Sequence, residues 1–176
     1  MKTMILCAPG LEECEALMTF DLLKRAGIET DLVGLSSPIV SSHGLHFTPD
    51  RLIEDTDPHD YDCLVLPGGM PGTKNLDNSE TVQSFIDLFL KEGKLIAAIC
   101  AAPSILLHRG LLKDGEFTVF PGFENGYVPS DKKAVQTGNL ITAKGLGAVH
   151  EFASLITAEL VSKEKAEEVL RQIQYL

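Results

Sequence analysis

Cys100 stands in a stretch typical of a nucleophile at a sharp turn. In LIAAICAAPSIL, residues 95–106, the small residues Ala98 and Ala102 lie two positions before and two after the cysteine. This spacing allows a strand to reverse into a helix with the nucleophile at the bend. Pro103 suits the first turn of that helix, whose free N–H groups favour a thiolate, so we expect a lowered pKa for Cys100. Free cysteines are also common as small buried side chains, and the pattern alone leaves that alternative open.

Two further segments carry groups that could assist a nucleophile. LPGGMPG puts Gly68 and Gly69 directly after an apolar run, where unhindered backbone N–H groups could face an oxyanion. GLEECEALMTFDLLKRAG begins with Glu12, Glu13 and Glu15, which complement the dipole of a helix that starts there. The apolar residues that follow place at least one of these carboxyls near the buried face, where it would keep its proton and hydrogen-bond a thiolate. A plain glycine turn and a plain helix start would give the same two patterns.

The histidines do not complete a cysteine–histidine pair. His108 lies eight residues after Cys100, about 12 Å along a helix, which is too far for a general base. The other four lie in a loop, in a predicted hairpin or at a helix start: His59, His43, His46 and His150. The four cysteines lack zinc-site spacing, and the chain has no phosphate-binding loop or dinucleotide motif. We therefore expect neither a metal nor a cofactor.

The elements that must position these residues alternate along the chain. The predicted strands are Thr3–Ala8, Thr30–Leu35, Cys63–Leu66 and Leu95–Ile99. The predicted helices are Glu13–Ala26, Ser79–Glu92, Pro103–Arg109, Val149–Val161 and Lys163–Gln174. Strands that are apolar on consecutive positions are typical of a parallel sheet covered on both faces. The sequence thus predicts one domain over residues 1–176, a three-layer α/β/α sandwich with a mostly parallel central sheet.

Two segments interrupt this alternation. Ile39–Phe47 predicts a hairpin, and Gly115–Ala143 predicts a second, irregular β region. In open α/β sheets, sites form in the turns beyond the carboxyl ends of the strands. PGLEECE, PGGMPG and CAAP each follow a predicted strand directly, so we expect them to converge on one crevice.

Charge and hydropathy limit the partners. Fifteen basic and twenty-five acidic residues give a net charge of −10, which repels phosphate backbones and anionic lipid. The first residues, Met1–Pro9, are too short an apolar run for a signal peptide, and no stretch approaches transmembrane length. We expect a cytoplasmic protein that binds neither nucleic acid nor membranes.

Four motifs in order give a resemblance to a known family. GLEECEALMTFDLLKRAG, YDCLVLPGGMPGTKNL, KLIAAICAAPSILLHRGLL and LITAKGLGAVHEFA resemble the ThiJ/PfpI superfamily, in the branch of the Parkinson-disease-associated protein and its bacterial relatives. The resemblance implies a flavodoxin-like sandwich and a homodimer. It also implies that Cys100 is the nucleophile, that Glu15 is its carboxyl partner and that the N–H groups of Gly69 and Ala101 form an oxyanion hole. His43 falls where relatives carry a basic residue near the pocket.

One position departs from the family pattern. Several members have a histidine before a proline where this chain has Phe120 before Pro121, in TVFPGFENG, which weakens a peptidase or amidase assignment. The resemblance implies instead a cofactor-free glyoxalase or deglycase, in which Cys100 attacks a small carbonyl substrate such as methylglyoxal, Glu15 moves the proton and lactate forms. The alternatives are a stress protein with Cys100 as oxidation sensor, a holding chaperone, and a role in thiamine-thiazole metabolism.

Overall fold

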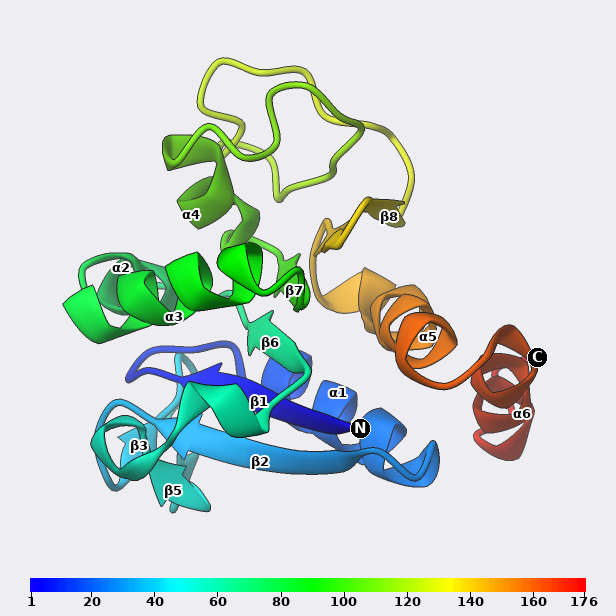
Figure 1. The fold of residues 1–176 in the computed structure, drawn as a ribbon, viewed down its shortest axis with the longest axis horizontal. Helices are drawn as coiled ribbons and strands as arrows, with labels where there is room; N and C mark the ends of the chain where they lie inside the picture. Colours follow the sequence, from blue (N-terminus) through cyan, green and yellow to red (C-terminus); the bar gives the residue numbers. More distant parts are fainter.

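The computed structural model describes residues 1–176, and a seven-stranded sheet runs through its centre (Figure 1). The sheet order is β5-β2-β1-β6-β7-β9-β8, and every neighbouring pair is parallel except β8 with β9. The strands are β1 (Lys2–Cys7), β2 (Glu29–Gly34), β5 (Arg51–Leu52), β6 (Cys63–Leu66), β7 (Leu95–Ile99), β8 (Ala134–Thr137) and β9 (Leu140–Ala143). This confirms the predicted mostly parallel sheet.

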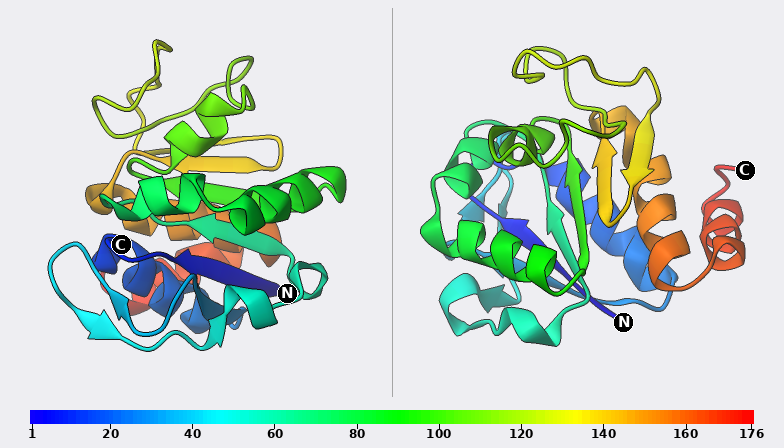
Figure 2. Two further views of the ribbon diagram at one scale, coloured as in Figure 1. Left: turned by 90° about the vertical axis from the view of Figure 1, so that its left-hand side faces the viewer. Right: turned by 45° about the horizontal axis from the view of Figure 1, so that its top comes forward.

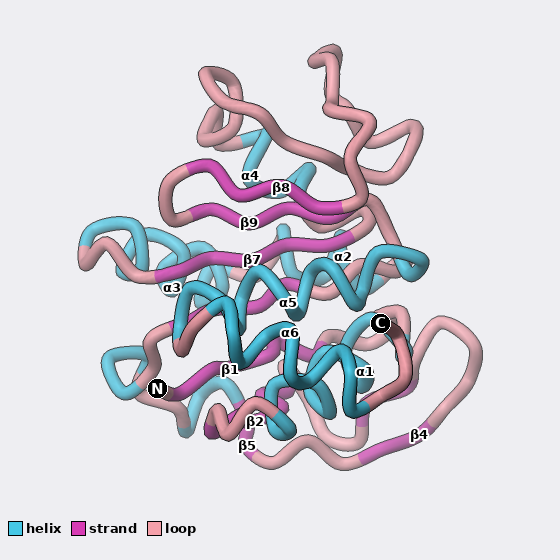
Figure 3. Tube along the Cα trace, turned by 90° about the vertical axis from the view of Figure 1, so that its right-hand side faces the viewer, coloured by secondary structure: helices cyan, strands magenta, loops and turns pink.

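Helices cover both faces of the sheet. They are α1 (Glu13–Arg25), α2 (Gly72–Asp77), α3 (Glu80–Lys91), α4 (Pro103–His108), α5 (Val149–Leu160) and α6 (Lys163–Gln172). One apolar cluster packs the sheet against α2, α3 and α4, and another packs it against α1, α5 and α6. Figure 3 shows the second group side by side, and Figure 2 shows the layers from two further directions. The predicted three-layer sandwich is confirmed.

The strand sequences account for the two clusters. Side chains alternate between the faces of a strand. In β1, Met4 and Leu6 belong to the cluster under α2, α3 and α4, whereas Ile5 and Cys7 belong to the cluster under α1, α5 and α6. All four are fully buried. An uninterrupted apolar run is therefore what a strand with two covered faces requires.

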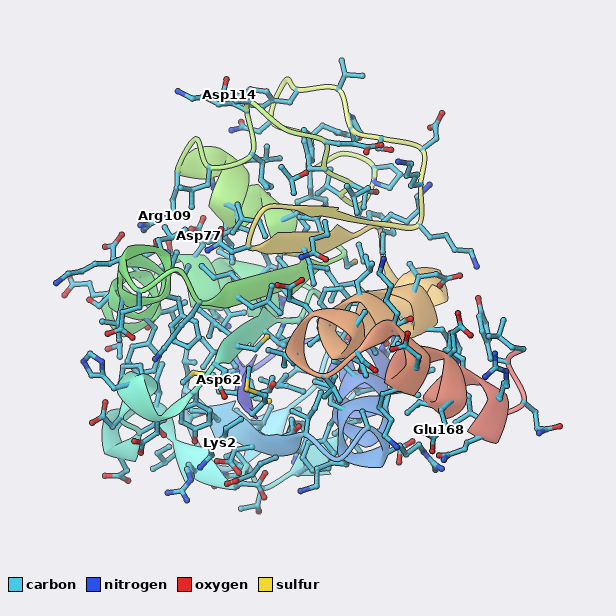
Figure 4. All side chains as sticks on the ribbon, turned by 45° about the vertical axis from the view of Figure 1, so that its right-hand side comes forward. Lys2, Asp62, Asp77, Arg109, Asp114 and Glu168 are labelled. Atoms are coloured by element: carbon cyan, nitrogen blue, oxygen red, sulfur yellow. The ribbon has the colours of Figure 1, made fainter.

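Polar contacts surround the start of β1, at the amino-terminal end of the strand. The Lys2 backbone N–H donates to Asp62 Oδ2 at 2.7 Å, and Figure 4 labels both residues. The Lys2 ammonium also pairs with Glu29 at 3.0 Å and Asp31 at 3.3 Å, both in β2. The carboxyl ends of the parallel strands β1, β6, β7 and β9 lie together on the other side of the sheet, away from Lys2. No helix of the structure has the length and apolar character needed to cross a membrane.

The two segments predicted to interrupt the alternation of strands and helices differ in the structure. The Ile39–Phe47 hairpin is confirmed as β3 (Ile39–Val40) paired antiparallel with β4 (His46–Phe47). The predicted irregular β region over Gly115–Ala143 is confirmed in its last part, where β8 and β9 pair antiparallel and join the central sheet, whereas residues 115–133 contain no strand. The latter residues form a long loop beside α4 (Figure 1).

Candidate active site

Cys100 occupies a sharp turn between β7 and α4. Its φ is 64°, a left-handed conformation that costs a residue with a side chain on the order of 1–3 kcal/mol. Two backbone hydrogen bonds hold it there: the Cys100 N–H donates to the Ala143 carbonyl at 2.8 Å, and the Phe120 N–H donates to the Cys100 carbonyl at 2.8 Å. The sequence AICAA thus forms the strand-to-helix bend that its spacing predicts.

Glu15 faces this turn from the first turn of α1. Its side chain is buried, with 1% exposure, and its carboxyl is hydrogen-bonded to the Cys100 thiol. The Gly68 N–H donates to Glu15 Oε2 at 3.0 Å, and the Leu146 N–H also faces the carboxyl. Glu12 caps the helix by accepting the Glu15 N–H at 2.6 Å. The cap therefore orients the turn that delivers Glu15 to the thiol.

The protonation of the pair follows from its burial. Burial raises the pKa of Glu15 to about 7, although hydrogen bonds from Cys100, Gly68 and Leu146 oppose the shift. Burial, together with the Glu15 charge, also raises the pKa of the Cys100 thiol to about 12. The lowered pKa predicted for Cys100 is therefore wrong while Glu15 is ionised. Burial removes the thiolate from water and the Glu15 carboxylate repels it, and these two effects outweigh the stabilisation of the thiolate by the nearby N–H groups. At rest the site holds a thiol beside a base that titrates near neutrality.

The backbone N–H groups near the sulfur have two different partners. The N–H groups of Gly69 and Ala101 face the Cys100 sulfur, where they favour negative charge. The N–H of Gly68, which the sequence also suggests for an oxyanion, is instead taken by Glu15. Gly68 matters for space, because a methyl group on it would lie 2.5 Å from Cys100 Cβ.

A cavity of about 530 Å³ lies next to the Cys100 turn. Gly145 lines this cavity and also neighbours the sulfur, because a methyl group on it would lie 3.9 Å from Cys100 Sγ and 3.4 Å from the Phe120 ring. The predicted pocket residues Phe120 and Pro121 both line this space. The full lining is Phe120, Pro121, Lys133, Lys144, Gly145, Leu146 and Gly147.

The structure places His43 beside Glu13 rather than against Cys100. His43 Nδ1 lies 3.2 Å from Glu13 Oε2, and the imidazole side chain is 71% exposed. One ligand atom each from Glu12, Glu13 and His43 fall within 4.8 Å of one another. These three are the residues that could hold a divalent cation, although Glu12 already caps α1 and Glu13 is already bonded to His43.

The remaining histidines also have other surroundings. His59 pairs with Glu92 at 2.8 Å, and His108 pairs with Asp77 at 3.0 Å. His150 stacks on Tyr175, and His46 is exposed on β4. Glu15 is thus the titratable group bonded to the thiol, in agreement with a sequence that shows no cysteine–histidine pair.

The turn after β9 is the part of the site that the sequence analysis misses. It supplies the Leu146 N–H that faces Glu15 and the glycine beside the sulfur. The signal is present as LITAKGLG, an apolar run followed by glycines, like the turns after β1 and β6. It is overlooked because the sequence places Leu140–Ala143 in an irregular β region and not in the central sheet. The pairing of these residues with β7 joins segments that are far apart along the chain.

The charge of Glu15 gives a first prediction. Iodoacetamide should alkylate Cys100 about tenfold faster in Glu15→Gln than in the wild type at pH 9, and at an equal rate at pH 5. The reason is that Glu15 adds to the raised pKa of the thiol only when Glu15 is ionised. Mass spectrometry of the Cys100 peptide over a pH series measures both rates.

Glu13→Gln is the matched control, because it removes a neighbouring carboxylate that pairs with His43 and should leave Cys100 unchanged. Cys7 and Cys63 are fully buried, with raised pKa values, and should remain unlabelled. Equal or slower labelling of Cys100 in Glu15→Gln at pH 9 would show that Glu15 is protonated beside a thiolate instead.

Comparison with known proteins gives consistent matches. The profile of the DJ-1/PfpI family matches residues 1–159. The chain is 36% identical to protein dj-1beta of Drosophila melanogaster, covering 97% of this chain and 95% of that protein. It is 32% identical to the glutathione-independent glyoxalase DJR-1.2 of Caenorhabditis elegans, over 98% and 95% of the two chains. Among solved structures, oxidized Toxoplasma gondii DJ-1 superposes with a TM-score of 0.93 at 30% identity, covering 98% and 97%.

Proposed function

Because the chain belongs to the DJ-1/PfpI family, we propose that it is a cysteine-dependent enzyme that converts small dicarbonyls such as methylglyoxal to 2-hydroxy acids. The observation that carries the proposal is the buried carboxyl of Glu15 hydrogen-bonded to the thiol of Cys100. A base whose pKa is about 7 is well matched to proton transfer near neutral pH. The name of the worm relative, a glutathione-independent glyoxalase, supports the same activity.

The first step is the addition of the thiol to the aldehyde. Cys100 Sγ attacks the aldehyde carbon of methylglyoxal while the ionised Glu15 accepts the thiol proton. The aldehyde oxygen becomes an oxyanion, which the N–H groups of Gly69 and Ala101 stabilise next to the sulfur. Transfer of the Glu15 proton to this oxygen completes a hemithioacetal.

The next steps move one proton between two carbons. Glu15 removes the hydrogen from the former aldehyde carbon and returns it to the neighbouring carbon, while the hydroxyl proton of the former aldehyde carbon passes to the neighbouring oxygen, which gives the lactate thioester of Cys100. Water, deprotonated by Glu15, then attacks the thioester carbon, and the sulfur leaves as the thiol. The sum is one methylglyoxal and one water to one lactate, with one carbon oxidised and its neighbour reduced. All the proton transfers use Glu15, whose carboxyl lies beside the sulfur.

The experiment that tests the proposal is direct identification of lactate from purified protein and methylglyoxal without added glutathione, metal or nucleotide. Loss of methylglyoxal alone is not sufficient, because adduct formation at lysines and cysteines also consumes it. Lactate must exceed the protein concentration many times over. If it does not, the enzyme proposal fails. Release of intact amines or thiols from glycated adducts tests the deglycase form of the same proposal.

A homodimer is the second part of the proposal. An apolar groove of about 350 Å³ lies between α1, the start of α5 and the end of α6, and is lined by Cys14, Leu17, Met18, Asp21, Leu22, His150 and Ile173. A second copy of the chain would cover this groove, as the family resemblance implies. Sedimentation of the wild type and of Met18→Glu, which places a charge in the groove, checks the assignment.

An oxidation-responsive role is a second candidate function, supported by the groups around the sulfur. Cys100 is half-buried, and the N–H groups of Gly69 and Ala101 could bond oxygens added to it. Mild peroxide should therefore add two oxygens to Cys100, giving a sulfinate, while Cys7 and Cys63 remain reduced because they are fully buried. Mass spectrometry of the cysteine peptides measures this.

Cys14 is the internal control for this oxidation, because it is also half-buried but lies outside the site, in the groove lined by Leu17 and Met18. Glu15→Ala should change the yield of sulfinate at Cys100, since the carboxyl is its bonding partner. Oxidation chiefly at Cys14, or an unchanged yield in Glu15→Ala, would rule out a built oxidation site at Cys100.

A further inference from the structure

The cavity beside Cys100 is positively charged, in contrast to the protein as a whole. The chain carries a net charge of −10, yet the charged residues that line this cavity are two lysines, Lys133 and Lys144, and no acidic side chain lines it. The rest of the lining is glycine, proline, leucine and phenylalanine. A cavity of this composition favours a ligand with an apolar part and a negative charge.

Lys144 is the lysine with a free charge. Lys133 is neutralised by Glu151 at 2.7 Å, and its ammonium also donates to the Tyr175 hydroxyl at 3.2 Å. The Lys144 ammonium instead donates to a backbone carbonyl, that of Asp131, at 2.7 Å, and has no carboxylate within 4.0 Å. Its remaining donors are available to an anion in the cavity.

The backbone holds Lys144 close to the reactive pair. Lys144 directly follows β9, and its N–H donates to the Lys133 carbonyl at 3.0 Å. The residue before it, Ala143, accepts the N–H of Cys100, and the residue after it is the glycine beside the sulfur. Lys144 thus lines the cavity one residue before Gly145, the residue that neighbours the sulfur.

We propose that Lys144 binds a carboxylate on the substrate, so that the preferred substrates are α-oxoaldehydes that carry a carboxylate rather than neutral methylglyoxal. This rests on the proposed function and specifies its substrate class. One unpaired ammonium matches the single charge of a carboxylate. The apolar stretch formed by Phe120, Gly145 and Leu146 fits the carbon chain between the two ends.

Alkylation tests the anion site without any turnover. Iodoacetate and iodoacetamide deliver groups of similar size and differ by one negative charge. The ratio of their rate constants at Cys100 should fall about three- to tenfold in Lys144→Gln, should stay at the wild-type value in Lys144→Arg, and should fall in the wild type at high salt. The double variant Lys133→Gln with Glu151→Gln is the matched control and should leave the ratio unchanged, because it removes an ion pair that carries no net charge.

Turnover gives the second readout. For 4,5-dioxopentanoate, an α-oxoaldehyde with a terminal carboxylate, KM should be lower than for methylglyoxal, and Lys144→Gln should raise KM for the acid alone. An unchanged alkylation ratio in Lys144→Gln and at high salt overturns the anion site, even if methylglyoxal is converted. A changed ratio with neither dicarbonyl converted upholds the anion site and overturns the proposed enzyme. The salt series keeps the test valid if Lys144→Gln does not fold.

Discussion

Cys100→Ala is expected to form no more lactate from methylglyoxal than a protein-free solution. Alanine has no nucleophile, so neither the hemithioacetal nor the thioester can form. The substitution removes one sulfur from a turn whose conformation is set by backbone hydrogen bonds to Ala143 and Phe120, so the fold should persist. Lactate quantified after many equivalents of substrate measures the effect.

Cys14→Ala is the matched control for this experiment. Cys14 is half-buried like Cys100, but it lies in the groove between α1, α5 and α6. It should retain full activity. Lactate formation by Cys100→Ala at the wild-type rate would show that the sulfur takes no part, and the oxidation-responsive role would then become the leading candidate function.

Glu15→Gln is expected to lose activity while gaining stability at alkaline pH. The amide keeps the size of the side chain and its bond from the Gly68 N–H but cannot accept a proton. Loss of a positioned acid–base group commonly costs about 10²- to 10⁴-fold in rate, and lactate formation should fall within that range. Iodoacetamide should still label Cys100, which separates loss of the base from loss of the nucleophile.

The stability gain follows from the raised pKa of Glu15. That pKa is about 7 in the folded protein, against 4.5 for an ordinary glutamate, so both states are protonated below pH 4.5 and no stability is lost there. As the pH rises from 4.5 to 7, the unfolded chain has ionised while the folded protein still keeps the proton, and stability falls by on the order of 3 kcal/mol, the equivalent of the difference between 7 and 4.5. Glutamine removes this loss.

Urea unfolding of both proteins at pH 4 and pH 8 measures the difference. The wild type should lose about 3 kcal/mol more than Glu15→Gln between the two pH values, because every other titrating group is common to both. Glu13→Gln, whose carboxyl is near the surface beside His43, serves as the control. Parallel pH dependence in wild type and Glu15→Gln would mean that Glu15 is not held protonated by burial.

The sequence predicts the fold where the signal is local. Runs such as MILCA and CLVL are apolar on both faces, and a helix flanked by Ser79 and Gly93 has clear ends, so these elements follow from the residues alone. The helix α2 is missed because GTKNLD has no apolar period, and β5 is only two residues long. β9 is misassigned because its place beside β7 depends on pairing across more than forty residues.

The same distinction holds for the site. Cys100, Glu15 and Gly69 each lie in or beside a turn that follows a predicted strand, and these turns converge as expected. Neither the pKa of the thiol nor the use of the Gly68 N–H could be predicted, because both depend on how deeply Glu15 is buried. The charged cavity also escapes prediction, since Lys144 reaches it only through the placement of β9.

The hydrogen bond from the Cys100 N–H to Ala143 links the reactive centre to β9, the last of the parallel strands along the chain. During synthesis the cysteine emerges from the ribosome well before residue 143, and until β9 has docked the hydrogen bond from the Cys100 N–H to Ala143 is absent. A nascent chain therefore lacks one of the two backbone bonds that hold Cys100 in the left-handed conformation. The proposed activity would begin only when the sheet is nearly complete, so it would report on finished folding.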